Sequence, residues 1–332
     1  PMEIASKGRK AILNYFEELE EAAEMVYEAK LLIVGDPGSG KTTLARRVCM
    51  PTAHVPEAII DTTRGVDVHA HTFQGSDDKP NFTMNIWDFG GQDIYHSVHQ
   101  LFLSKRALYI LLLDGRKEEN PNYWLQIQEL RGKDSPILIL LNKKGDIQDV
   151  KLSIKELQGE YPNLKGYQVL DLKNDLSGIQ HYQGVVENQI RHLPQFEQGE
   201  YLPKSWLNIR RELESLSQSQ NYIYLNQYKQ ICVKHGIDKL ESQDFLSGYL
   251  HDLGAILHFQ DVPMLKKILI LNSDWATDGI YQVLDHTREH QNNGHFEKEV
   301  LKQVWEDASH LEMEDEFLAL MERFELCYKV PQ

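Results

Sequence analysis

The chain has 332 residues, a formal net charge of −15 at pH 7, and ordinary shares of hydrophobic (41%) and charged (26%) residues. Its length exceeds what one hydrophobic core usually holds, so we expect two domains. The acidic balance argues against a nucleic-acid partner, and the longest apolar runs are far too short for a membrane helix of roughly 20 residues.

The first element expected is an amphipathic helix within residues 4–29. Apolar residues recur there at the spacing of one helix face, namely Ile12, Leu13, Phe16, Leu19, Ala23 and Val26. We therefore assign residues 1–29 to an N-terminal helix and linker. The opening Pro1-Met2 is unusual for a native terminus, and we expect further sequence upstream.

The next region, residues 30–196, predicts an α/β domain. It begins with an apolar strand at 30–34, a glycine-rich loop and a helix around 44–48. Strand-like segments at 66–73 and 82–87 flank a turn-forming cluster at 75–80, which predicts a β-hairpin. Apolar strands then alternate with helical patterns, as is typical of parallel βαβ units: strands at 107–113, 136–141 and 167–170, and helices at 120–131, 151–160 and 178–192.

The last region, residues 197–332, predicts a mainly helical domain. Long helical stretches are expected at 206–216, 226–235 and 243–253. Its large apolar residues indicate a packed helical core and not a cofactor site: Trp206, Leu213, Tyr228, Phe245, Leu250, Leu253 and Phe259.

The strongest motif is a phosphate-binding loop, GxxxxGK followed by Ser or Thr. It is matched without a gap by Gly35, Asp36, Pro37, Gly38, Ser39, Gly40, Lys41 and Thr42. The motif follows a strand and opens a helix, where backbone N–H groups converge on phosphate oxygens. We expect Lys41 to reach the β and γ phosphates, Thr42 to bind Mg²⁺, and Thr43 to complete the nucleotide-binding set.

A second motif, at residues 88–92, lies at the end of the strand 82–87. Asp88 can reach Mg²⁺ through water, Gly91 can offer its amide to a γ-phosphate, and Gln92 would orient the attacking water. This DxxGQ arrangement resembles the second switch of Ras-like GTPases. The same resemblance implies that Thr63 is the switch threonine that closes over Mg²⁺. A rival interpretation makes Asp114 the metal ligand of a Walker B strand, and hence the protein an ATPase.

The base-reading element is expected after the strand 136–141. Asn142, Lys143 and Asp146 resemble the NKxD element of GTPases, with one extra residue before the aspartate that excludes adenine. An alternative register begins at Lys143, which loses the asparagine but keeps Asp146. Leu172 stands where Ras-like proteins offer a backbone amide to the guanine oxygen.

Several motifs in order resemble the Roco family. Residues 88–92, 111–116 and 123–125 resemble its Roc domain, and residues 202–206, 249–254, 256–259, 274–276 and 320–327 resemble the COR domain that follows. The resemblance covers nearly the whole chain. It implies a Ras-like α/β P-loop GTPase with a mixed six-stranded sheet flanked by helices, then a mainly α-helical COR domain, with leucine-rich repeats upstream.

The resemblance also implies an assembly and one further catalytic residue. Roco proteins dimerise through the C-terminal half of COR, which we expect to be absent, so that this chain alone would be a monomer while the full-length protein is a homodimer. Arg116 matches an arginine that can act as a finger on the transferring phosphoryl group. The alternative for Arg116 is a surface ion pair with Glu118 or Glu119.

The function implied is a slow, Mg²⁺-dependent GTPase whose nucleotide state is read out by COR in signalling. Two alternatives stay open: a scaffold that holds GDP or GTP without turnover, and a P-loop signalling ATPase. The cysteines Cys49, Cys232 and Cys327 are far apart and never in a CxxC spacing, which fits a reducing, cytoplasmic setting. The histidines form no HExxH motif, so we expect them to be ordinary surface and core residues.

Overall fold

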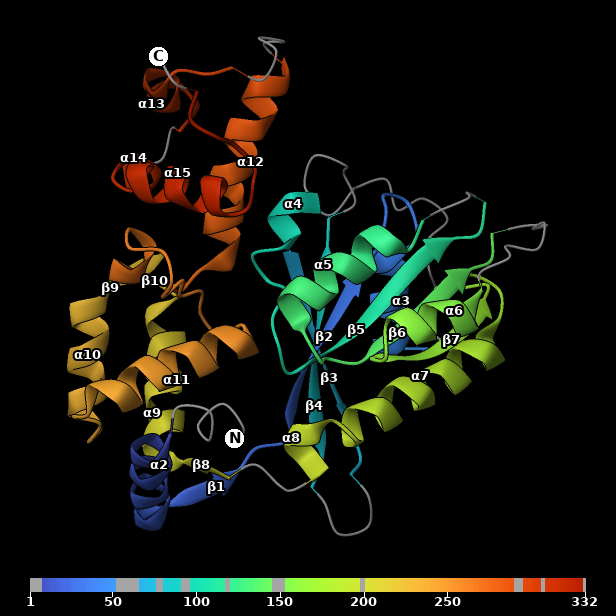
Figure 1. The fold of residues 1–332 in the computed structure, drawn as a ribbon, viewed down its shortest axis with the longest axis horizontal. Coiled ribbons are helices and arrows are strands. Elements are labelled where there is room, and N and C mark those ends of the chain that lie inside the picture. The colour runs from blue at the N-terminus through green and yellow to red at the C-terminus, as the bar shows by residue number, and fades with distance from the viewer. Residues whose placement is uncertain are drawn as a thin grey trace. The chain divides into compact units, whose positions relative to one another are not determined.

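The computed structural model describes residues 8–51, 66–75, 80–90, 96–116, 120–144, 153–197, 201–289, 295–305 and 308–330. The chain divides into two compact units (Figure 1). The α/β unit comprises Met25–Asp93 and Leu103–Glu200, and the helical unit comprises Pro1–Glu24, Ile94–Phe102 and Tyr201–Gln332. Each unit is described by itself.

The α/β unit is built on one six-stranded sheet with the order β3-β4-β2-β5-β6-β7. The β3–β4 pair is antiparallel and every other pair is parallel, which confirms the predicted mixed sheet and the hairpin. The strands are β2 Glu28–Val34, β3 Val66–Phe73, β4 Phe82–Phe89, β5 Ala107–Asp114, β6 Ile137–Asn142 and β7 Leu164–Leu170.

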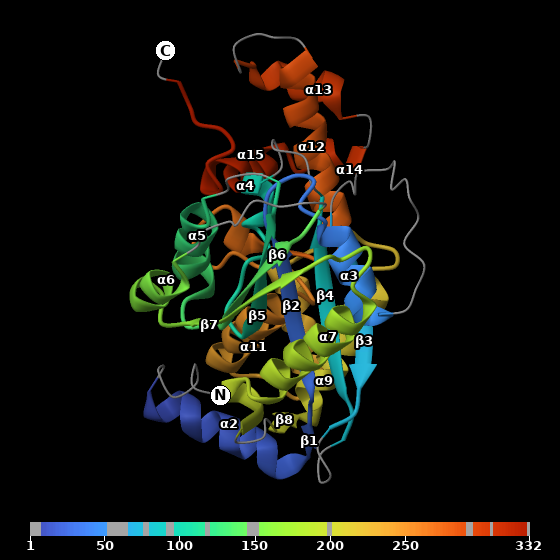
Figure 2. The ribbon, with the colours of Figure 1, turned by 90° about the vertical axis from the view of Figure 1, so that its right-hand side faces the viewer.

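Helices cover both faces of this sheet (Figure 2). The helices α3 Lys41–Cys49 and α7 Leu176–Arg191 share a core with one face, and α5 Asn122–Gly132 and α6 Ile154–Glu160 lie on the other. All eight residues of β5 are buried, as expected for a central parallel strand covered on both sides. A short helix, α8 Pro194–Glu197, ends the unit.

The parallel strands bring five loops to one edge of the sheet. The strands β2, β4, β5, β6 and β7 run in the same direction, so the segments that follow them emerge at a common carboxyl edge. In open α/β sheets this edge is where ligands bind. The glycine-rich loop, Asp88, Asp114, Asn142 and Leu172 all belong to it.

The helical unit confirms the mainly helical second domain. Its helices include α4 His96–His99, α9 Lys204–Leu216, α10 Leu225–Lys234, α11 Leu240–Leu253, α12 Ser273–Glu289, α13 Leu301–Val304, α14 Ala308–Leu311 and α15 Glu314–Arg323. A two-stranded antiparallel sheet joins β9 Tyr222–Tyr224 to β10 Ile268–Ile270. Of the predicted core residues, Leu253 is only half-buried; the buried ones are Trp206, Leu213, Tyr228, Phe245, Leu250 and Phe259.

The first helix is shorter than predicted and packs within the helical unit. It is α2 Arg9–Glu21, so the expectation that it extends through Ala23 and Val26 is wrong. A strand, β1 Ala23–Met25, follows instead and pairs with β8 Tyr201–Pro203. The indole of Trp206 donates a 2.7 Å hydrogen bond to Glu18 of α2, which ties α2 to α9.

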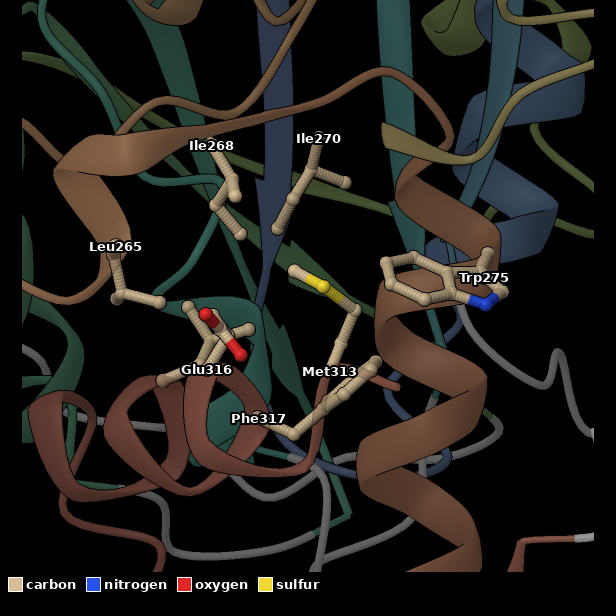
Figure 3. A pocket seen from close by; sticks show the side chains of 8 residues that line it. Leu265, Ile268, Ile270, Trp275, Met313, Glu316 and Phe317 are labelled. Carbon is tan, nitrogen blue, oxygen red and sulfur yellow. The ribbon is translucent and has the colours of Figure 1, made fainter. Parts of the chain in front are cut away.

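A small apolar pocket lies in the helical unit (Figure 3). It is lined by Leu265, Ile268, Ile270, Trp275, Met313, Glu316, Phe317 and Leu320, of which Glu316 alone is charged. The indole N–H of Trp275 is already bonded to Ser309, at 2.8 Å. This lining is that of a helical core and not of a catalytic site. Within the described part of the chain, no helix is both long enough and apolar enough to cross a membrane.

Candidate nucleotide-binding site

The loop between β2 and α3 has the backbone shape of a phosphate cradle. Gly35, Gly38 and Gly40 have φ values of 143°, 74° and 111°, which side chains rarely adopt. A Cβ on Gly35 would lie 2.1 Å from the carbonyl oxygen of Leu112. The helix α3 begins directly after Gly40, so its free N–H groups and positive dipole end face the loop.

Lys41 lies buried beneath this loop. Its Nζ donates to the carbonyl oxygens of Gly35, at 2.8 Å, and Asp36, at 3.1 Å. The side chain of Lys41 is only 4% exposed, and these contacts hold its charge where a phosphate would be held. Thr42 and Thr43 follow in the first turn of α3 and are half-buried, as a hydroxyl ligand for a bound metal requires.

Asn142 fastens the loop to two other segments of the same edge. Its Nδ2 donates to the carbonyl of Ser39 at 2.7 Å, and its Oδ1 accepts the amide of Leu172 at 3.3 Å. From α3, Arg47 donates to the carbonyls of Leu172 and Lys173, both at 3.1 Å. The phosphate loop and the segment after β7 are therefore held in a fixed relation, as a ligand that contacts both would need.

The structure places Lys144, and not Lys143, against the phosphate loop. Lys144 Nζ donates to the carbonyl of Gly38 and lies 3.3 Å from Oδ2 of Asp114. The Lys143 side chain is exposed, near the carboxylate of Asp171. Asn142 and Lys144 thus both reach the loop, with Lys143 between them. The structure therefore keeps the asparagine of the first register and the lysine position of the register that begins at Lys143.

Asp114 is the anchor of a small ionic network at the end of β5. Arg116 contacts its carboxylate through Nε at 3.0 Å and Nη2 at 2.6 Å. Burial acts to raise the pKa of Asp114, but the hydrogen bonds and charges of Arg116 and Lys144 outweigh it and lower the pKa to about 2. Arg116 therefore pairs with Asp114, and Glu118 and Glu119, the partners suggested from the sequence, lie outside the described residues.

Asp88 is a buried carboxylate near the start of α3. It is fully inaccessible on β4, and no described residue donates it a hydrogen bond of ordinary length. Burial raises the pKa of Asp88 to about 6, although nearby Thr42 and Lys41 act in the opposite direction. A buried carboxylate beside a threonine hydroxyl fits a hard divalent cation, because Mg²⁺ takes oxygen ligands and neutralises such a charge.

Asp67 and His69 on β3 join Asp88 in a cluster that the sequence analysis did not identify. One ligand atom from each of the three residues lies within 4.8 Å of the other two. The alternation of β3 was visible in the sequence, but the pairing of Asp67 with Asp88 follows only from the strand register. No motif marks it.

Trp124 is a second contact that the sequence analysis did not assign to the site. Its indole N–H donates to Oδ1 of Asp36 at 3.0 Å, from the first turn of α5. Trp124 is 3% exposed, so this hydrogen bond is sheltered from water. The neighbouring Tyr123 has a pKa raised by its own burial and by the charge of Asp36. The side chain of Asp36 is thus directed toward α5.

Four predicted site residues lie outside the described part of the chain: Thr63, Gly91, Gln92 and Asp146. Their proposed roles stay predictions. The remaining members of the predicted set lie on the common edge of the sheet described above, namely residues 35–43, Asp88, Arg116, Asn142, Lys143 and Leu172.

Two family models match consecutive parts of the chain. Residues 30–145 match the model described as Ras of Complex, Roc, domain of DAPkinase. Residues 203–332 match the model described as C-terminal of Roc, COR-A domain. Together the two matches follow the order of the predicted domains.

Curated proteins and a solved structure are similar over nearly the whole chain. Probable serine/threonine-protein kinase pats1 from Dictyostelium discoideum is 27% identical over 99% of this chain, and a Roc-COR-CHAT protease from Runella zeae is 26% identical over 92%. The chain spans only 11% and 34% of the length of these two relatives. The structure of Methanosarcina barkeri Roco2 RocCORdC bound to GDP is 33% identical, with a TM-score of 0.84, and the match covers 96% of this chain and 97% of that one.

Proposed function

Because the chain belongs to the Roco family, with a Roc GTPase domain followed by a COR-A domain, we propose that it binds GDP and GTP and slowly hydrolyses GTP as a signalling switch. The nucleotide would occupy the carboxyl edge of the α/β unit. The phosphates would lie in the loop of residues 35–42, and the base would lie between the segments that follow β6 and β7. A solved structure similar over nearly the whole chain is bound to GDP, which supports binding of a guanine nucleotide.

The observation that carries the proposal is the bracing of the phosphate loop by Asn142. A phosphate cradle alone would serve ATP or GTP. Here the same asparagine holds the loop through Ser39 and the segment after β7 through the amide of Leu172. A base held by the segment after β7 would therefore be kept in a fixed relation to the phosphates, which is what selection of one purine over another requires.

The lysine assignment supports guanine as the base. With Lys144 on the phosphate loop, residues 144–146 read as Lys-Gly-Asp, which has the KxD spacing without any gap. Asp146 would then accept both guanine N–H groups, an interaction that adenine cannot offer. In this register Lys143 is the inserted residue.

Thr42 and Thr63 would hold Mg²⁺ directly and Asp88 would act on it through water. When bound, the ion would neutralise phosphate charge. Lys41 would add a second positive charge at the phosphates. Gly91 would offer its amide to the γ-phosphate, and Gln92 would orient the attacking water, so that catalysis rests on positioning.

Arg116 is proposed as a catalytic residue only in a rearranged state. In the structure the Nε and Nη2 groups of its guanidinium donate to Asp114, although its side chain is 55% exposed. An arginine finger must contact the transferring phosphoryl group. To act in this way Arg116 would have to exchange Asp114 for the phosphate, which Lys144 would ease by remaining on the carboxylate.

The network around Asp114 argues against the ATPase alternative. A Walker B aspartate must turn its carboxylate to Mg²⁺ or to a water on it. The carboxylate of Asp114 is instead engaged by the two cations Arg116 and Lys144. Asp88, beside Thr42, is the better placed acid for the metal.

A single-turnover assay separates the GTPase from the scaffold without turnover. The chain is loaded with GTP, and release of inorganic phosphate is followed after addition of Mg²⁺. We expect measurable release that Gln92→Ala slows by about tenfold or more, because water is no longer oriented. Equal release from Gln92→Ala and the unchanged chain would rule out this catalytic role, and no release from either would favour the scaffold.

The readout by the COR domain is part of the same proposal. The γ-phosphate would order the segments that carry Thr63 and Gln92, and hydrolysis would remove that order. The helical unit would respond to this change. Homodimerisation of the full-length protein and a cytoplasmic setting stay predictions from the family resemblance.

A further inference from the structure

The face of the hairpin that carries Asp88 also carries two other metal-ligating side chains. Asp67 and His69 are two residues apart on β3, so they point to the same side of the sheet. The register places Asp67 directly opposite Asp88 in the antiparallel pair. One imidazole nitrogen and two carboxylate oxygens, one from each residue, all lie within 4.8 Å of one another.

The like charges and the burial in this cluster favour a bound cation, in addition to the nearby Thr42 and Lys41 that act on Asp88. Two carboxylates directly opposite each other on antiparallel strands repel. Asp88 is fully buried, and Nε2 of His69 is also shielded from solvent without a hydrogen-bond partner among the described residues. Buried polar atoms of this kind are normally satisfied, by a protein group, a water or an ion. Asp67 is exposed, which leaves a path for an ion to enter.

The donor set indicates which ion. Mg²⁺ prefers oxygen ligands and keeps its waters, whereas imidazole together with carboxylates suits a first-row transition metal such as Mn²⁺. We infer that Asp67, His69 and Asp88 form a site that binds a divalent transition-metal ion directly, before any nucleotide is present. The inference shares Asp88 with the proposed GTPase site, but it needs neither a phosphate nor a base.

His71 provides a matched control on the same strand. It lies on the same face of β3, one step further along, but its Nε2 is 3.3 Å from Oε1 of Glu187 and 3.3 Å from the side-chain nitrogen of Gln183, both on α7. Its ring nitrogen is therefore already engaged away from the cluster. Substituting His71 should perturb the strand as much as substituting His69 and should leave the metal site intact.

Binding of Mn²⁺ to protein stripped of nucleotide and metal with EDTA tests the site. The free Mn²⁺ signal is followed by electron paramagnetic resonance for the unchanged chain and for Asp67→Asn, His69→Gln and His71→Gln. We expect one bound ion on the unchanged chain and on His71→Gln. Affinity should fall by more than about tenfold in Asp67→Asn and His69→Gln, because loss of even an outer partner of a ligand costs 10–100-fold.

Three results would overturn the inference. One is the absence of bound Mn²⁺ on the stripped chain, another is equal affinity in all the variants, and the third is an equal loss in His71→Gln. Thermal unfolding of each variant, and its affinity for GDP with Mg²⁺, show whether the fold is retained. Because the Mn²⁺ measurement contains no nucleotide, its outcome is independent of whether the chain binds GTP.

Discussion

Asp114 is held by two cations, and this arrangement has a defined dependence on pH. Its pKa in the folded chain is about 2, below the ordinary value of 3.8. A carboxylate with a lowered pKa contributes stability that is complete above its unfolded pKa and is lost as the pH falls through the folded one. The network should therefore be fully formed from pH 5 upward and should weaken only in acid.

Asp114→Asn tests this dependence. We expect the free energy of unfolding in urea to fall by about 1–2 kcal/mol, the lower part of the range for a charged hydrogen bond because Arg116 is half exposed. The cost should be the same at pH 5 and pH 8. As a control, Asp261→Asn removes an exposed pair with Arg323 and should cost less than about 1 kcal/mol. A cost for Asp114→Asn that shrinks steeply between pH 8 and pH 5 would contradict the lowered pKa.

Lys144 and Lys143 form a natural pair of variants for the base-reading register. Lys144→Met should weaken GDP binding by about tenfold or more, since it removes charged hydrogen bonds worth about 1.5–3 kcal/mol at the phosphate loop. Lys143→Met should change GDP affinity little, because that side chain is exposed. Titration with fluorescent GDP measures both. The reverse ranking would show that Lys143 is the lysine of the NKxD element and that the extra residue lies between it and Asp146.

Gly40 is a position where only glycine fits. Its φ is 111°, and a Cβ there would lie 2.7 Å from Nδ2 of Asn142. Gly40→Ala should therefore abolish measurable nucleotide binding by displacing the asparagine. Gly184, on an exposed part of α7, has open space around it, so Gly184→Ala should retain binding and stabilise the chain by up to about 1 kcal/mol. Calorimetric titration of the two variants with GDP measures both affinities. Retained binding in Gly40→Ala, or loss of binding in Gly184→Ala, would contradict the prediction.

At the scale of elements, α5 is attached to the phosphate loop by a sheltered hydrogen bond from Trp124. The indole of Trp124 donates to the carboxylate of Asp36. The contact directs this carboxylate toward α5 and braces the first residues of the loop. We therefore expect α5 to control how firmly the loop holds GDP.

A double-mutant cycle tests this link between α5 and the loop. Trp124→Phe and Asp36→Ala should each speed dissociation of GDP by about threefold or more, and the double variant should be no faster than the single ones. Asp36→Asn keeps an acceptor oxygen and should behave like the unchanged chain. Additive effects in the stopped-flow rates would mean that the two residues act separately.

At the scale of the whole molecule, local patterns predicted the elements and their order well. The apolar strands and helical periods of residues 30–192 are confirmed within a few residues, and so is the mixed sheet. The first helix was overextended because its apolar spacing continues into a segment that pairs with β8. That pairing joins residues nearly 180 positions apart, which helical periodicity cannot register.

The site was predictable where a motif has a fixed spacing and not where it depends on contacts across the sheet. The glycine-rich loop was predictable because phosphate binding prescribes its order of residues, and Asn142 because its segment resembles the NKxD element. The position of Lys144 on the phosphate loop depends on how the extra residue is accommodated, which the spacing does not show. The partner of Arg116 is Asp114, a buried carboxylate two residues earlier, and its burial follows only from the sheet. The cluster of Asp67 with Asp88 depends on strand register alone.

The affinity of the chain for fluorescent GDP, measured with and without Lys41, tests directly whether the loop of residues 35–42 binds a guanine nucleotide. We expect tight binding of GDP that GTP displaces and that a large excess of ATP does not displace. Lys41→Ala should weaken binding by at least about tenfold, because the phosphates lose a buried charged donor. A Lys41→Ala chain that retains GDP as tightly as the unchanged chain, or displacement by ATP as effective as by GTP, would contradict this expectation.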